Sequence, residues 1–138
     1  MVKTIFALHG PLADSGQFSG KVAFSNGVKV TGGELVFVSG QLAMDENRNL
    51  VGKGDAGAQT RQVLKNIKVV LDAAGATFRD VVKVTVFIKD MAHFRDIHDA
   101  RLEFFSEDSL PASTMVEVSG FVHPDALIEI ECVAVINP

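Results

Sequence analysis

Three glutamates stand in two otherwise apolar stretches near the end of the chain, which makes them the first candidates for acid–base chemistry. Glu117 lies in "STMVEVSG", and Glu129 and Glu131 lie in "LIEIECVAVI". A carboxylate among apolar neighbours can accept a proton or orient an attacking water molecule. Alternate residues of a strand also face solvent, and for Glu117 and Glu131 taken alone this simpler interpretation is preferred.

A glycine-rich motif precedes the main helical pattern. "GKGDAG", Gly52 to Gly57, matches the dinucleotide-binding pattern GxGxxG. A polar loop rather than a buried strand comes before it, however, and Asp55 would place a negative charge where a pyrophosphate needs backbone donors. We therefore interpret the motif as a loop that ends in the N-cap of a helix.

Histidine and cysteine provide no metal or nucleophile pattern. His93 and His98 are five residues apart and would point to different sides of a helix, and His9 and His123 are distant in sequence, so no metal site is expected. Cys132 lies in "IECVAV" between apolar residues, which favours a core position over a catalytic thiol.

The bulk composition excludes several classes of protein. The chain has 138 residues, a formal net charge of -4 and a single cysteine. One domain spanning residues 1–138 is expected, without an internal disulfide. Acidic and basic residues are interleaved, so no nucleic-acid partner is expected, and no apolar run is long enough to span a membrane. We expect a soluble cytoplasmic protein.

The hydrophobic pattern predicts an α+β domain. Helices are expected from the cap at Asp55 to Gly75 and from about Met91 to Phe105, the second with Phe94, Ile97, Arg101 and Phe105 along one stripe. Strands are expected at 4–8, 22–30, 35–40, 80–90, 113–119 and 127–135, with a tight hairpin turn at "TGGE". Half-buried strands and two amphipathic helices fit one sheet with both helices on one face.

The second face of that sheet is predicted to be partly apolar. If the strands alternate regularly, it carries Phe87, Ser113, Met115, Glu117, Ser119, Glu129, Glu131, Val133 and Val135. Apolar side chains on a nominally exposed face are typical of a surface that meets other subunits. A closed oligomer is therefore expected.

From Leu35 onward the sequence resembles the Rid family, also called the YjgF family, of small proteins that hydrolyse reactive imines. The motifs that carry the resemblance are "SGQ", the helix "QTRQVLKN", the segment "LPASTMVEV" and the strand "IEIE". The resemblance implies a fold similar to chorismate mutase of the small trimeric type. It also implies a homotrimer whose sheets form a central barrel, with ligand clefts between subunits and no cofactor.

The same resemblance implies a set of site residues. Glu129 matches the glutamate that orients the attacking water, and Gly40 matches the turn that offers backbone groups. Ser113 stands where the family has a carboxylate-binding arginine. Met115 replaces a frequent cysteine, Phe18 replaces a tyrosine, and His98 matches an asparagine of the bacterial enzymes.

These departures shape the functional hypotheses. A serine hydroxyl provides one neutral hydrogen bond where an arginine provides two charge-assisted ones, so Ser113 should weaken the binding of a small imino acid by about 2 to 4 kcal/mol. The first hypothesis is a deaminase of a small imine or enamine whose anionic group is absent or bound differently. Glu129 would be its catalytic group, and His98 is a candidate replacement cation. Phe18, Phe87 and Met115 would form apolar walls. The alternative is a non-catalytic trimer that binds a metabolite or regulates a partner.

Overall fold

The computed structural model describes residues 2–6 and 22–137. The elements along the chain are β1 (Val2–Phe6), β2 (Gly27–Thr31), β3 (Glu34–Gln41), α1 (Ala56–Ala74), η1 (Phe78–Asp80), β4 (Val81–Ile88), η2 (Met91–His93), α2 (Phe94–Leu102), η3 (Glu107–Ser109), β5 (Ala112–Glu117) and β6 (Ile128–Ile136). The η elements are single 3-10 turns.

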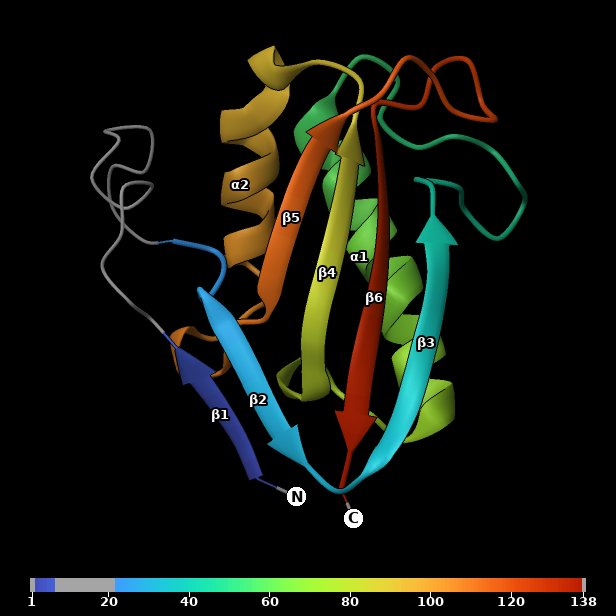
Figure 1. Ribbon diagram of the computed structural model, residues 1–138. Helices are drawn as coiled ribbons and strands as arrows, with labels where there is room; N and C mark the ends of the chain where they lie inside the picture. Colours follow the sequence, from blue (N-terminus) through green and yellow to red (C-terminus); the bar gives the residue numbers. More distant parts are fainter. Residues whose placement is uncertain (1, 7–21, 138) are drawn as a thin grey trace.

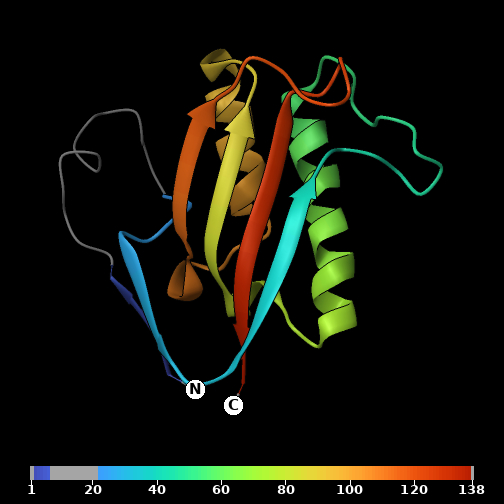
Figure 2. The same ribbon diagram turned by 45° about the vertical axis from the view of Figure 1, so that its right-hand side comes forward.

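A four-stranded sheet in the order β3-β6-β4-β5 forms the centre of the fold. β4 and β5 are parallel, because α2 carries the chain back along the sheet between them, and β6 is antiparallel to both of its neighbours. Both helices lie on the same face of this sheet (Figures 1 and 2). The predicted α+β architecture is confirmed.

The N-terminal strands differ from the prediction of one continuous sheet. β1 and β2 pair with each other in a separate antiparallel pair. Gly32 and Gly33 have φ angles of 73° and 90°, so the tight turn at "TGGE" is confirmed. The expected hairpin is wrong, because the strands on either side of that turn do not pair with each other. β2 pairs with β1, and β3 pairs with β6 (Figure 1).

The helix α1 has the predicted ends. The Asp55 side chain accepts a hydrogen bond from the backbone N–H of Ala58 at 3.0 Å and forms the N-cap. Gly75 ends the helix in the left-handed conformation, with φ of 76°. The apolar stripe packs against β3 and β6 and includes Val63, Leu64, Ile67 and Leu71, all buried. In the other helix, α2, the buried residues are Ile97, His98, Ala100 and Arg101.

Strand β4 alternates as predicted, apart from a bulge at its start. Val84, Val86 and Ile88 are buried under the helices. The pairing with β6 shifts by one residue between Val81 and Lys83, so that Val81 is fully buried there and Val82 only half-buried. The remaining core residues of the sheet come mainly from β6.

The predicted orientation of β5 is wrong. Its register pairs Ser113 with Val84 and Met115 with Val86, and likewise Glu117 with Ile88. Side chains of paired residues share a face, so these three β5 residues lie on the helix side and not on the outer side. The strand begins with small polar residues, so its sequence pattern did not show which of its two faces meets the core.

The outer face of the sheet is the one that the helices leave uncovered. It carries Leu35, Phe37, Lys83, Thr85, Phe87, Thr114, Val116, Glu129, Glu131 and Val133, by the register of the four strands. Leu35 and Phe37 are 64% and 72% exposed in one chain. The predicted apolar character of this face is therefore present. No helix among the described residues is long and apolar enough to cross a membrane.

Candidate active site

The Glu129 carboxylate lies in a space that Gly40 leaves open. Glu129 is the second residue of β6 and is half-buried on the outer face. A methyl group on Gly40 would lie 2.8 Å from Cδ of Glu129 and 3.1 Å from its Oε2. Such distances are shorter than a real Cβ contact allows, so a side chain at position 40 would displace the carboxylate. The structure thus brings together two of the residues that the sequence selected.

A β-bulge places Gly40 beside that carboxylate. The pairing of β3 with β6 runs from Val38 opposite Cys132 to Gln41 opposite Ile130, so that Ser39 and Gly40 together oppose one residue. Bulges of this kind bend a strand and change the direction of its side chains and backbone groups. The "SGQ" motif therefore forms the end of β3 where the regular ladder stops.

Phe87 completes this first group of residues. It is the direct partner of Glu129 across the β4–β6 pairing and is half-buried on the same face. Side chains of directly paired residues lie beside each other, so the ring is placed next to Glu129, and its role as an apolar wall stays a prediction. We call Gly40, Phe87 and Glu129 the β6 half-site.

A buried glutamine fixes the start of β6. Gln59 of α1 accepts a hydrogen bond from the Leu127 backbone N–H at 2.8 Å, and its amide nitrogen donates to the carbonyls of Asp125 and Gly52 at 3.0 and 3.1 Å. Leu127 is two residues before Glu129. Sequence reasoning missed this role, although a glutamine on the apolar side of "QTRQVLKN" is a visible signal.

A second group lies on the helix side of β5. The Arg101 Nη2 of α2 donates a hydrogen bond to the Ser113 Oγ at 2.8 Å. His98, one turn before Arg101, is buried and stacks on Phe94 with ring centroids 5.7 Å apart. Met115 follows along β5 and packs against the core. We call His98, Arg101, Ser113 and Met115 the β5 half-site.

Arg101 is the residue of this group that the sequence did not single out. Its side chain is only 3% exposed, and burial lowers its pKa to about 10, so the guanidinium is charged at neutral pH. Within residues 2–6 and 22–137 no carboxylate forms an ion pair with it. Burying such a cation costs several kcal/mol, whereas a hydrogen bond to a neutral hydroxyl returns about 0.5 to 1.5 kcal/mol. In the sequence, the feature that could have pointed to Arg101 is the presence of an arginine within the apolar stripe of α2.

The two half-sites do not meet within one chain. Ser113 and Glu129 belong to strands that are separated by β4, and their side chains lie on opposite faces of the sheet. The structure therefore does not gather all the predicted residues into one pocket of a single chain. Phe18 lies outside the described residues.

The remaining polar motifs have structural roles. Gly52 and Gly54 have φ angles of 82° and 75°, which explains the first two glycines of "GKGDAG" by backbone geometry. The Glu117 carboxylate accepts a hydrogen bond from the Met91 N–H at 3.0 Å and supports the start of the second helical segment. Burial, followed by the charge of Glu131, raises the pKa of the Cys132 thiol to about 12, as expected of a core cysteine.

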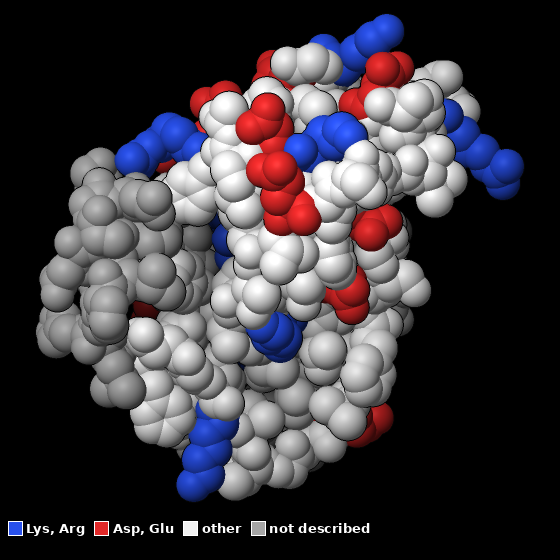
Figure 3. All heavy atoms as spheres, turned by 45° about the horizontal axis from the view of Figure 1, so that its top comes forward, with Lys and Arg blue, Asp and Glu red and all other residues white. Residues whose placement is uncertain are grey.

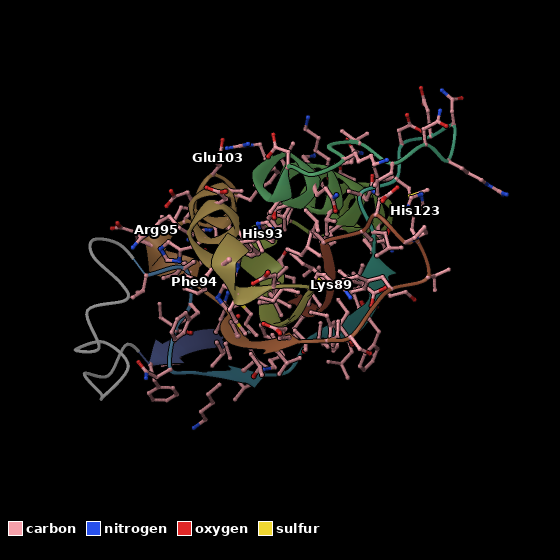
Figure 4. The ribbon with its side chains drawn as sticks, turned by 90° about the horizontal axis from the view of Figure 1, so that it is seen from above. Lys89, His93, Phe94, Arg95, Glu103 and His123 are labelled. Carbon is pink, nitrogen blue, oxygen red and sulfur yellow. The ribbon has the colours of Figure 1, made fainter. Side chains whose placement is uncertain are left out.

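The histidines are dispersed. The Nδ1 of His123 accepts a hydrogen bond from the Asp125 N–H within the loop before β6, while His93 lies at the start of α2, well apart from it in Figure 4. Among the described residues, no group of three or more histidine, cysteine or acidic side chains could hold a metal ion. On the face shown in Figure 3, acidic and basic side chains are both present and lie interspersed.

Comparison with known proteins extends these observations. The family model described as endoribonuclease L-PSP matches residues 16–136. A RutC family protein of Pyrococcus horikoshii is 45% identical over 111 residues, which are 80% of this chain and 85% of that protein. The 3-aminoacrylate deaminase RutC of Acinetobacter baylyi is 47% identical over 100 residues, 72% of this chain and 78% of the enzyme.

Solved structures of proteins from the same family have a similar fold. A Rid family protein of unknown function from Yersinia pestis, YyfB, superposes with a TM-score of 0.84 and 32% identity, covering 99% of this chain and 100% of the other. The E. coli YjgF protein superposes with a TM-score of 0.69 and 35% identity over 83% of this chain and 88% of that one.

Proposed function

The chain belongs to the endoribonuclease L-PSP family, which includes the Rid and YjgF proteins, and from this membership we propose that it deaminates a small imine or enamine by hydrolysis. The observation that carries the proposal is the close approach of Gly40 to the Glu129 carboxylate. A relative named 3-aminoacrylate deaminase supports the reaction class, because 3-aminoacrylate contains an enamine.

Glu129 is the proposed catalytic residue. Its carboxylate accepts a hydrogen bond from a water molecule and orients the water oxygen toward the carbon of a C=N bond. As the C–O bond forms, the water proton passes to the carboxylate and then to the substrate nitrogen. The hydroxyl proton of the resulting carbinolamine then passes to its nitrogen as the C–N bond breaks, giving a carbonyl compound and ammonia. An enamine enters the same sequence after protonation at carbon gives the iminium ion, whose C=N carbon the water attacks.

The surroundings of Glu129 suit this role. Gly40 leaves the carboxylate room and presents backbone groups at the bulge, and Phe87 lines the space with an aromatic ring. No cofactor is needed, since the reaction consumes only water.

A complete cleft is proposed to form between subunits of a homotrimer. The two half-sites lie on opposite faces of the sheet in one chain, so a single cleft containing both requires the β6 half-site of one subunit and the β5 half-site of its neighbour. The exposed apolar side chains of Leu35, Phe37 and Val116 on the outer face support association through that face.

A turnover assay tests the proposal. Freshly generated imines and enamines, both acidic and neutral, are offered to the wild type and to Glu129→Gln, and ammonia release is measured. We expect the substitution to reduce turnover by about a hundredfold or more, because it removes the proton acceptor. Glu131→Gln is the matched control, since Glu131 lies on the same face of β6 and is exposed.

The assay also separates the alternative function. If none of the compounds turns over but some raise the melting temperature of the wild type, the protein is a metabolite-binding trimer on this scaffold. Equal turnover by the wild type and Glu129→Gln would show that another group performs the chemistry.

A further inference from the structure

We propose that Arg101, together with Ser113, binds the carboxylate of the substrate, so that the substrate is a small acid whose charge is held from α2. This inference rests on the proposed function for the identity of the reacting site, but anion binding can be measured without turnover. Arg101 would then provide, from α2, the positive charge that Ser113 does not provide at position 113.

Arg101 contrasts with the paired cations at the surface of the structure. Arg61, Arg79 and Lys68 pair with carboxylates at the surface, at nitrogen–oxygen distances of 2.7 to 2.9 Å. Arg101 is far more buried than these, yet among the described residues its recorded acceptor is a neutral hydroxyl. Buried charges are normally paired, and no carboxylate of residues 2–6 and 22–137 fills that role, so the position of Arg101 favours an anionic ligand.

Arg101 and Ser113 together have the hydrogen-bonding capacity to hold a carboxylate. A guanidinium has five N–H donors in a planar fork that fits the two oxygens of a carboxylate. A serine hydroxyl can accept one hydrogen bond and donate another at the same time. While Ser113 accepts from Arg101, its own O–H can therefore donate to a ligand oxygen, and both residues would contact one carboxylate.

Arg101 meets the sheet at its edge. Its partner Ser113 is half-buried near the start of β5, the edge strand of the four-stranded sheet, so part of the residue that contacts the guanidinium is exposed. His98 and Arg101 are three residues apart and share the buried side of α2, so a polar surface faces β5 here. An apolar helix–sheet contact would not require either residue.

A purely structural role for Arg101 is the competing explanation, in which the side chain only ties α2 to β5. The two explanations differ in what the binding of an anion should do. A structural tie predicts lower stability when Arg101 is replaced but no change in ligand preference. An anion site predicts a specific loss of preference for the charged ligand.

Propanoate and propanamide are suitable ligands, because they have the same size and differ in charge. Their binding to the full-length wild type is compared by saturation-transfer NMR and by thermal shift. We expect propanoate to bind and propanamide to bind about tenfold more weakly or not at all. No preference for propanoate would overturn the proposal.

Arg101→Gln is expected to abolish the preference, with a loss of about ten- to a hundredfold in propanoate affinity. Arg61→Gln is the matched control, because it removes the same charge from an exposed site on α1. Arg101→Gln combined with Ser113→Arg should restore propanoate binding by moving the cation to the strand. If Arg101→Gln folds and retains the preference, Arg101 has only a structural role.

Ser113→Asp keeps the test decisive if Arg101→Gln does not fold. The new carboxylate would pair with Arg101 and occupy its donors, so we expect a folded protein that no longer binds propanoate. Unchanged propanoate binding by Ser113→Asp would overturn the proposal.

The failure of this inference and that of the proposed function are distinguishable. Glu129→Gln should keep propanoate binding while losing turnover. If the wild type binds propanoate through Arg101 but releases no ammonia from any compound, the anion site stands and the deaminase proposal fails. If Arg101→Gln turns over acidic substrates with an unchanged KM, the deaminase proposal stands and the anion site fails.

Discussion

Gly40 lies so close to Glu129 that position 40 has no room for a side chain: a Cβ atom there would be 2.8 Å from the carboxylate carbon of Glu129. Two residues that are 89 positions apart in the sequence are thus coupled by the β3–β6 pairing and its bulge. Gly40 has no positive φ angle that would require glycine for backbone reasons. The absence of a side chain here is explained by the carboxylate alone.

Gly40→Ala should therefore reduce turnover more than stability. The added methyl group displaces the end of the flexible Glu129 side chain, and a displacement of about 1 Å can reduce a rate by up to about a hundredfold. We expect turnover to fall by about ten- to a hundredfold and the free energy of unfolding to change by about 1 kcal/mol. Ammonia release and urea unfolding measure the two effects.

Gly120→Ala is the control for this substitution, because a methyl group at Gly120 would have nothing within 4 Å. It should leave both quantities near their wild-type values. Wild-type turnover by Gly40→Ala would mean that the position of the Glu129 carboxylate does not limit the reaction.

Gln59→Ala should lower both stability and turnover. The substitution leaves the Leu127 N–H and the carbonyls of Gly52 and Asp125 without their amide partner, and we expect a loss of about 2 to 4 kcal/mol in the free energy of unfolding. Turnover by the folded fraction should also fall, because Leu127 leads directly into the strand that carries Glu129.

Gln62→Ala in the same helix is the comparison for Gln59. Its amide donates to Asn66 within α1 and contacts no part of the loop before β6 among the described hydrogen bonds. A similar loss from both substitutions would show that Gln59 matters only for the helix.

The sequence predicted those parts of the fold whose hydrophobic pattern has a clear period. The ends of α1 followed from Asp55 and Gly75, and the buried face of β4 followed from its valines. The pairing of β2 with β1 could not be predicted from the sequence pattern. A glycine turn determines where the chain changes direction, but it does not determine with which strand each neighbouring segment pairs.

The candidate site was predicted less completely, for a reason that lies in β5. Small polar residues and a methionine occupy the helix side of this strand, so alternation could not distinguish its two faces. The mistaken face concealed the contact between Ser113 and Arg101, which depends on the register of β5 against β4 and on the packing of α2. Neither is encoded in a local pattern.

Phe37→Glu should weaken subunit association. Phe37 is 72% exposed in one chain and pairs with Val133 on the apolar outer face, where a charge would have to be buried in an assembled oligomer. We expect a lower mass in sedimentation experiments at micromolar concentration, with the far-UV circular dichroism spectrum retained. Turnover should fall with the mass if the cleft lies between subunits.

Val69→Glu is the matched control for this charge. Val69 is 68% exposed but belongs to α1, on the other side of the sheet. Its substitution should leave the mass of the wild type unchanged. A wild type that sediments as a monomer would remove the basis for an inter-subunit cleft.

Lys3 should make stability rise with pH above about 8. Its Nζ donates to the carbonyls of Arg79, Val81 and Ser109 at 2.8, 2.9 and 2.8 Å, and burial lowers its pKa to about 8, while the charge of Asp80 opposes that shift. In the unfolded chain the pKa is about 10.4, so between these values the unfolded state binds more protons than the folded state. The free energy of unfolding must then increase with pH across this window.

The measurement is urea unfolding of the wild type and Lys3→Met at several pH values from 7 to 10.5. Because Lys3 is partly exposed, we expect the stability of the wild type relative to the variant to rise by about 1 to 2 kcal/mol from pH 8 to pH 10.5. Below pH 8 the difference should be constant, since Lys3 is protonated in both states there. A difference that falls as pH rises would mean that the three carbonyls stabilise the ammonium more than burial destabilises it, and would reverse the assigned direction of the pKa shift.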